Sequence, residues 1–303
     1  MNILYNINKN FGIKLFKNPN TLNYNIFNYF FKKKISNQIN DDLIKSYHES
    51  GFIKPKIKLS SLAFYIKEKL EKNLLKKQKN FSNDHSILFD VSDDIKEKIK
   101  KHISEDFNDV LKKLKSYYQN NIVVANIEIK RNFGISNLTH YTLDKRDKNK
   151  EFYNNYYHCD YYTMNYFKLF INLQEITNEH GPLTFYSIKD TKKFVKESNF
   201  LNRTDYKNII LNNEIKNCGK LGDCLILNTP QCIHRASIPK TGNFRDVLCI
   251  TFVAVYQKTD DIFYYEKFYP RDIWNMEKNI AKKFAKPYNF RNTLNLYNKL
   301  TNN

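Results

Sequence analysis

The second half of the chain is a succession of short strand-like segments with little helical pattern between them. β-branched and aromatic residues gather in short runs, each bounded by Gly, Pro, Asn or Asp. These runs are 122–129, 137–143, 167–173, 182–186, 224–228, 233–237 and 245–256. Many short strands separated by turn residues favour a sandwich or barrel of the jelly-roll kind. The sequence therefore predicts a mainly β fold beyond residue 121.

The first half has the periodicity of helices. Asn40 or Asp41 can cap a helix that Gly51 ends, and a short strand at 52–53 follows it. Ser60 or Ser61 opens a second helix, whose apolar face is Leu62, Ile66 and Leu70. A third helix is predicted from the cap Ser92 to Tyr117, with one apolar stripe: Ile95, Ile99, Ile103, Phe107, Val110, Leu114 and Tyr117.

No internal repeat or linker divides the chain, so a single domain is expected. Its parts are a helical N-terminal portion packed on the core (1–120), a β core (121–258) and a C-terminal helical tail (259–303). With 41% hydrophobic and 15% aromatic residues among 303, the chain can bury a sizeable core.

The formal net charge of +19 has two explanations. It can serve an anionic partner such as nucleic acid, a membrane surface or a phosphorylated substrate. It can also follow from A/T-rich codon usage, which would enrich Asn, Ile, Tyr and Phe together with Lys. Because the Lys residues are scattered and not confined to one stripe, the second explanation is favoured, and no specific nucleic-acid partner is expected.

Cysteine usage and the N-terminus predict where the protein works. Five Cys at irregular spacing make a poor disulfide framework, which favours a reducing, cytoplasmic setting. The first residues lack the apolar core of a secretion signal. No apolar run approaches the roughly 18 residues that span a bilayer, so no membrane span is expected.

The candidate chemistry begins with His158 and Asp160, an H-x-D pair. Residues two apart on a strand point to the same face, so an imidazole and a carboxylate can meet at one ion. Such a pair also occurs by chance, as a surface His beside a solvated Asp. A second His strengthens the metal interpretation, because His234 begins a strand after the turn at 222–223 and the strand at 224–228.

Two His and one carboxylate form the facial triad that binds Fe(II) and leaves adjacent positions open. Arg245 lies eleven residues after His234, at the head of another apolar strand. A hairpin over the turn at 239–243 would bring it back beside His234. A buried Arg there would suit a dicarboxylate cosubstrate, because its planar fork grips a carboxylate in two places.

At these residues the chain resembles the phytanoyl-CoA dioxygenase family of Fe(II)/2-oxoglutarate oxygenases. The resemblance covers roughly residues 40–256 in layout and is most specific at His158-Cys-Asp160, 167–176, the turn 178–182, Gly222-Asp223, His234 and Arg245. Ala236 departs from it, because many members carry a small hydroxylated residue there; Ser237 is next in this chain.

The resemblance implies a double-stranded β-helix, a cupin-like jelly roll. It implies Fe(2+) held by His158, Asp160 and His234, with Arg245 pairing the C5 carboxylate of 2-oxoglutarate. The implied activity uses O2 to hydroxylate a small-molecule substrate, and forms succinate and CO2. The carboxylate at Asp160 favours hydroxylation over halogenation, while desaturation, epimerisation and ring closure use the same triad.

Alternatives remain open at this point. The chain could be a non-catalytic jelly-roll module that recognises an anionic ligand through a basic surface. Lys168 either faces the cavity or is exposed on the other face of its strand, and exposure is the expectation. Arg235 is expected to point away from His234, and His180 to be solvated. The other His residues lack ligand-like neighbours, and the oligomeric state stays open.

Overall fold

The computed structural model of the chain describes residues 41–77, 86–118, 121–134, 156–160, 166–198, 212–255 and 262–263. The predicted strand at 137–143, the N-terminal residues 1–40 and nearly all of the predicted tail at 259–303 lie outside these residues. The division into three parts therefore stays a prediction at both ends of the chain.

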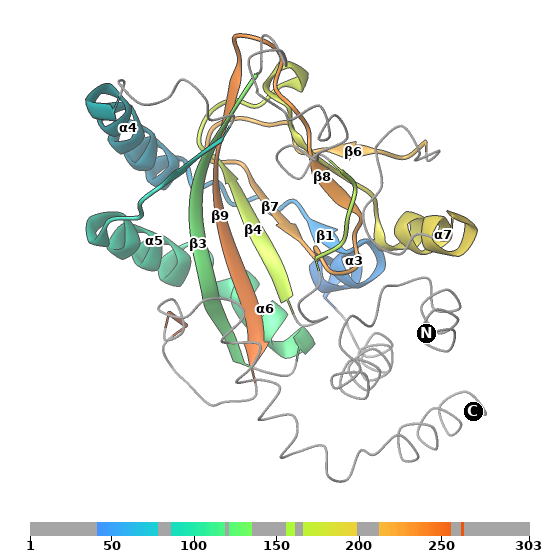
Figure 1. Cartoon of the computed structure of the whole chain (residues 1–303). Coiled ribbons are helices and arrows are strands. Elements are labelled where there is room, and N and C mark those ends of the chain that lie inside the picture. Colours follow the sequence, from blue (N-terminus) through green and yellow to red (C-terminus); the bar gives the residue numbers. More distant parts are fainter. Residues whose placement is uncertain are drawn as a thin grey trace, which may run out of the picture.

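Two antiparallel sheets form the centre of the described structure (Figure 1). In spatial order the large sheet consists of β1 (Phe52–Ile53), β7 (Cys224–Leu227), β4 (Tyr166–Asn172), β9 (Phe244–Val255), β3 (Asn121–Phe133) and β2 (Ser86–Phe89). The small sheet consists of β6 (Ile215–Lys216), β5 (Leu183–Phe185) and β8 (His234–Ala236). The fold is mainly β with N-terminal helices, and it has the two-sheet architecture of a double-stranded β-helix. The predicted fold class is confirmed.

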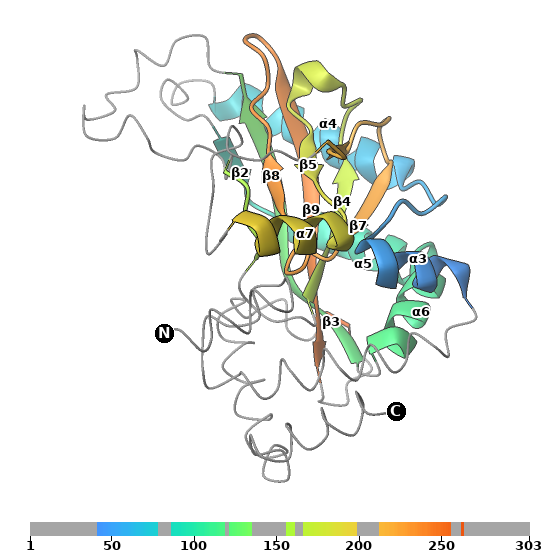
Figure 2. The ribbon, with the colours of Figure 1, turned by 90° about the vertical axis from the view of Figure 1, so that its right-hand side faces the viewer.

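The helices make a separate layer on one face of the large sheet. They are α3 (Asp42–Ser50), α4 (Ser60–Lys77), α5 (Asp93–Glu105) and α6 (Asn108–Tyr118). Figure 1 shows α4 and α5 on the side of the large sheet opposite to the small sheet and α7 (Ile188–Ser198), and Figure 2 shows α3 near α7, at the β1 edge of the large sheet. One apolar core joins these four helices to β3, β4, β7 and β9. A second core, which includes Phe185, Leu225 and Leu227, fills the space between the two sheets.

Local sequence signals predicted several element boundaries correctly. Asp41 caps α3 by accepting hydrogen bonds from the amides of Leu43 and Ile44, and Gly51 ends the helix in the left-handed conformation. The predicted face of α4 is buried at Leu62, Ile66 and Leu70. The predictions for these two helices are confirmed.

The predicted single helix from Ser92 to Tyr117 is wrong, because the chain breaks between α5 and α6. Asp106 and Phe107 both donate backbone hydrogen bonds to the carbonyl of His102, and Phe107 then starts the next helix by accepting from Leu111. Asp and Asn favour helix ends because their side chains compete for backbone groups, and Asp106 and Asn108 flank this break. The apolar stripe itself is buried along its whole length.

Three described elements were not predicted from the sequence: α7, β2 and β6. β2 and β6 are short edge strands of four and two residues. α7 is amphipathic, with Ile188 and Phe194 buried, but it follows directly after a strand. Such short or interrupted patterns are hard to separate from loops by periodicity alone.

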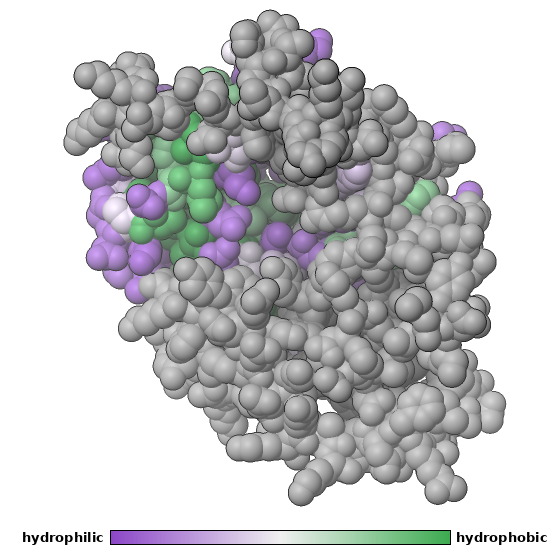
Figure 3. All heavy atoms as spheres, viewed as in Figure 1, coloured by the Kyte–Doolittle hydropathy of each residue, from purple (hydrophilic) through white to green (hydrophobic). Residues whose placement is uncertain are grey.

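The described surface carries an apolar area bordered by hydrophilic side chains, on the side of α4 and α5 (Figure 3). Phe64 on α4 and Leu88 on β2 are among the exposed large hydrophobic residues. None of the helices in the described part of the chain has the length and apolar character needed to cross a membrane.

Gly51 lies between α3 and β1 in the chain, and it packs against the loop that leads into β8. Its carbonyl accepts a hydrogen bond from the amide of Asn228, and a Cβ at this position would meet the Cys232 sulfur and lie 2.6 Å from Ile188 Cγ1. Its φ is +83°. We expect Gly51→Ala to lower the free energy of unfolding by about 1–2 kcal/mol for the left-handed backbone, and by about 1–3 kcal/mol more for overpacking.

Gly242 provides the matched control. Its φ is +81°, and a Cβ there would meet nothing within 4 Å among the described residues. Gly242→Ala should therefore show the backbone cost alone. Urea unfolding of the two variants measures the difference, and equal destabilisation would contradict the close packing around Gly51.

Candidate metal centre

Two histidines from distant parts of the chain lie side by side through their backbones. The amide of His158 donates to the carbonyl of His234 at 3.0 Å, and the amide of His234 donates back at 2.9 Å. This exchange places the segment at 157–158 beside β8, on the edge that β5 leaves open. Directly opposite residues of an antiparallel pair point to the same face, and the two imidazole centroids are 4.5 Å apart.

Both imidazoles are held in the orientation that a metal ligand needs. His158 Nδ1 lies 2.8 Å from the carbonyl oxygen of Tyr156, and His234 Nδ1 lies 2.9 Å from that of Cys232. A carbonyl can only accept, so Nδ1 carries the proton in each ring. The lone pair is then on Nε2, and this arrangement is typical of histidines that bind metals.

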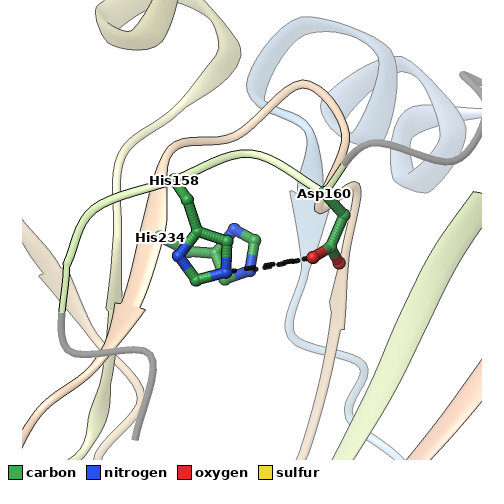
Figure 4. A group of neighbouring side chains, drawn as sticks. All are labelled: His158, Asp160 and His234. Carbon is green, nitrogen blue, oxygen red and sulfur yellow. Dashed lines mark ion pairs between the residues drawn. The ribbon is translucent and has the colours of Figure 1, made fainter. Parts of the chain in front are cut away.

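Asp160 completes the cluster. Its amide donates to the carbonyl of Thr229, which ties it to the loop between β7 and β8. Its Oδ1 lies 3.9 Å from Nε2 of His158 and 3.9 Å from Nε2 of His234. Figure 4 shows both rings turned toward this carboxylate. One ligand atom from each of the three residues lies within 4.8 Å of the others, so together they could hold one metal ion.

The electrostatics of the cluster favour an ionised carboxylate. Burial alone would raise the pKa of Asp160, but the positive charge of Lys168, the largest opposing influence, helps to hold this pKa below its usual value. Lys168 Nζ lies 2.9 Å from Asp160 Oδ2. Burial lowers the pKa of Lys168, yet the neighbouring Asp160 carboxylate outweighs it and raises this pKa well above its usual value. The expectation that Lys168 is exposed on the far face of its strand is wrong.

Arg245 is buried, but the predicted hairpin beside His234 is wrong. β8 belongs to the small sheet, whereas β9 pairs with β3 and β4 in the large sheet. The chain crosses from one sheet to the other between them. Nη1 of Arg245 instead donates to the carbonyl of Gly181, in the turn just before β5. Because Ser237, just after β8, donates its amide to the Pro182 carbonyl, this turn lies at the far end of β8 from His234.

The other candidate residues lie elsewhere. Arg235 points away from the cluster, as expected: its guanidinium lies over the Tyr157 ring and 3.7 Å from Glu214. His180 caps the short helix η3 (Asn178–His180), where its Nδ1 accepts from the amide of Thr177. His48 and His102 contact Tyr117 and Asp106. His85 and His140 lie outside the described residues.

The role of Thr229 in placing Asp160 was not predicted. The available signal was the turn sequence Asn228-Thr-Pro-Gln231, which comes just before His234. For Lys168, a position facing the cavity was one of two alternatives, and the signal was its place in the middle of the predicted strand at 167–173. Neither signal decides which way a side chain points, because that depends on the sheet packing.

The donor set itself limits which ions fit. Two neutral imidazole nitrogens and one carboxylate oxygen suit Fe(II), and they leave positions open for other ligands. Catalytic zinc can also use two histidines and a carboxylate. The fold and this cluster together define a jelly-roll protein with a candidate His–Asp–His metal centre.

No protein-family model matches the chain, and no curated protein matches it. The chain is similar in fold to several solved structures. One is the α-ketoglutarate-dependent epimerase SnoN from nogalamycin biosynthesis, at 12% identity over 74% of this chain and 84% of that chain, with a TM-score of 0.45. Another is EctD from S. alaskensis with bound Fe, at 12% identity over 75% and 81%, with a TM-score of 0.48.

A third similar structure is HygX from Streptomyces hygroscopicus with nickel and 2-oxoglutarate bound. Its identity is 10% over 76% of this chain and 94% of that chain, with a TM-score of 0.47. At such low identities, the function of this chain is inferred from its own residues.

Proposed function

We propose that this chain is a non-haem Fe(II)/2-oxoglutarate-dependent dioxygenase of the phytanoyl-CoA dioxygenase type. It oxidises a small-molecule substrate with O2, and it forms succinate and CO2. The observation that carries the proposal is the cluster of His158, Asp160 and His234 within a jelly roll, with Nδ1 of each imidazole held by a carbonyl. Hydroxylation is the proposed reaction, because a carboxylate and not a small residue stands at position 160.

The three residues would hold iron, which with 2-oxoglutarate and O2 supplies the oxidising chemistry. The ionised Asp160 carboxylate offsets part of the charge of the ion, while the two neutral imidazoles donate lone pairs. The carbonyls of Tyr156 and Cys232 fix both rings, so little reorientation is needed when the ion binds. Both histidines are buried, which restricts the access of water to this site.

Arg245 is the proposed partner of the distal carboxylate of 2-oxoglutarate. It is only 6% exposed, and a buried guanidinium attracts a carboxylate more strongly than one in water. Alternation along β9 places Arg245 on the same face as Cys249 and Thr251, whereas Leu248 and Ile250 face the helices. Lys168 pairs with Thr251 in the sheet register and is on this face too. The proposed cosubstrate residue therefore shares a face with the residue that contacts Asp160.

We also propose that the enzyme works in the cytoplasm, as the cysteine pattern predicts, and without a specific nucleic-acid partner. His158 and Asp160 of the H-x-D pair belong to the candidate metal cluster. The enzyme proposal therefore accounts for this pair, whereas a module that binds an anion through a basic surface would leave it incidental. The scattered Lys residues are then a property of composition.

The test is spectroscopic and chemical. Anaerobic addition of Fe(II) and then 2-oxoglutarate to the full chain is expected to give a weak visible charge-transfer band. Admission of O2 should then convert 2-oxoglutarate to succinate, faster with a true substrate from a small-molecule library. A zinc site would give no such band, because the d¹⁰ ion is colourless. If neither the band nor succinate appears, the proposal fails.

A further inference from the structure

Lys168 is a charged residue in the middle of the large sheet. It pairs with Leu227 of β7 on one side and with Thr251 of β9 on the other. Its neighbours Phe167 and Leu169 are fully buried against the helices. Because side chains alternate along a strand, Lys168 projects from the opposite face, toward the small sheet and the metal cluster.

The two oxygens of the Asp160 carboxylate face different neighbours. Its Oδ1 is the atom 3.9 Å from both imidazole Nε2 atoms, whereas its Oδ2 lies 2.9 Å from Nζ of Lys168. In Figure 4 the dashed lines end on one carboxylate oxygen, and the other oxygen points away from the rings. The side chains of Asp160 and Lys168 are 13% and 21% exposed, so water screens their ion pair little.

Resting on the proposed function, we propose that Lys168 is a positioning residue that retains Oδ2 of Asp160, so that only Oδ1 binds the metal. A carboxylate can bind a metal ion through one oxygen or through both. Binding through both would take up one of the positions that the facial triad leaves open. The cosubstrate and O2 need those positions. Lys168 thereby sets how many sites the metal offers to other ligands.

A strand position is suited to this task. β4 lies between two hydrogen-bonded neighbours, so the backbone of Lys168 is fixed. Its long side chain can then reach Asp160, which the amide bond to Thr229 fixes independently. The two partners are thus anchored separately, and the ion pair orients the carboxylate without having to hold the loop.

The test uses Mn²⁺ as the probe, added to the full chain without cosubstrate. Water proton relaxation counts the waters on the bound ion, and electron paramagnetic resonance gives its affinity. In Lys168→Met, the freed Oδ2 is expected to displace one of about three waters, so the relaxation enhancement of bound Mn²⁺ should fall by about a third. Lys168→Arg keeps the charge and should rescue the wild-type value.

Lys130 on β3 offers the matched control. It is half-buried, and Lys130→Met removes one positive charge without touching Asp160. This variant should keep the wild-type relaxation. Lys168→Gln gives a second neutral variant should the Met variant not fold, and the same fall is expected because its shorter side chain does not reach Oδ2.

The outcomes separate the two proposals. If wild-type protein binds Mn²⁺ and a folded neutral variant at 168 shows the same relaxation enhancement, the positioning role is overturned and the proposed function stands. The positioning role is also overturned if a neutral variant at 168 has a lower unfolding temperature but the same number of waters on the bound Mn²⁺. If the wild-type chain does not bind Mn²⁺, the proposed function falls, and this inference falls with it.

Discussion

His234→Ala is expected to weaken metal binding by more than about 100-fold and to abolish succinate formation. Loss of a residue that merely orients a metal ligand already costs about 10- to 100-fold in affinity, and loss of a ligand costs more. The remaining pair, His158 and Asp160, would offer one imidazole and one carboxylate. Titration with Mn²⁺ and assay of 2-oxoglutarate consumption measure the two effects.

His102→Ala is the matched control for this variant. His102 also contacts an aspartate, with its Nδ1 2.6 Å from Asp106, but it lies on α5 in the helical layer. Its loss should leave metal affinity and turnover unchanged. Retention of wild-type affinity by His234→Ala would exclude the proposed metal centre.

Arg131→Met is expected to lower the free energy of unfolding by about 3–5 kcal/mol, because it leaves a buried carboxylate without its partner. Arg131 on β3 and Asp246 on β9 are directly opposite, and Nε and Nη2 of the guanidinium donate to the two carboxylate oxygens at 2.7 and 2.5 Å. Their side chains are only 10% and 1% exposed. Urea unfolding gives the magnitude.

The pH dependence of this loss has a definite sign. Burial raises the pKa of Asp246, while Arg131 opposes the rise. Without Arg131 the pKa in the folded state should rise further. The deficit of the variant is therefore largest above that pKa and shrinks as the pH falls and Asp246 becomes neutral.

Two further variants define the origin of the effect. Arg131→Met combined with Asp246→Leu should recover most of the stability, since a buried ion pair can be replaced by apolar residues at little cost. Lys240→Ala removes an exposed ion pair with Glu179 and should cost less than about 1 kcal/mol. A loss below that level in Arg131→Met would contradict the buried pair. The pair matters for the site, because Asp246 adjoins Arg245 and fixes the start of β9.

Local sequence signals predicted much of the fold. Caps and turns gave the ends of α3, and alternating or apolar runs gave β4, β7 and β9, because both depend on neighbours a few residues away. The break between α5 and α6 was not predicted, because the apolar stripe continues through it. The strand at 122–129 was also underestimated: β3 extends to Phe133 and contains a register shift between Val124 and Asn126, which breaks strict alternation.

The candidate site was predictable in its residue types but not in its surroundings. His158, Asp160 and His234 are recognisable by spacing and by the turns around them. The prediction of a hairpin that brings Arg245 beside His234 was wrong, because a short turn between two strands is compatible both with pairing in one sheet and with crossing to another. Only the register of β9 against β3 and β4 distinguishes these outcomes.

By itself, the sequence determined that helices come before the strands of the core, the mainly β class and the three candidate ligands, because these follow from periodicity and residue chemistry. Only the tertiary structure decided that His158 and His234 exchange backbone hydrogen bonds, that Lys168 contacts the far oxygen of Asp160, and that β8 and β9 lie in different sheets. These features join residues far apart in the chain, and such contacts are chosen by the packing of whole sheets and not by any local pattern.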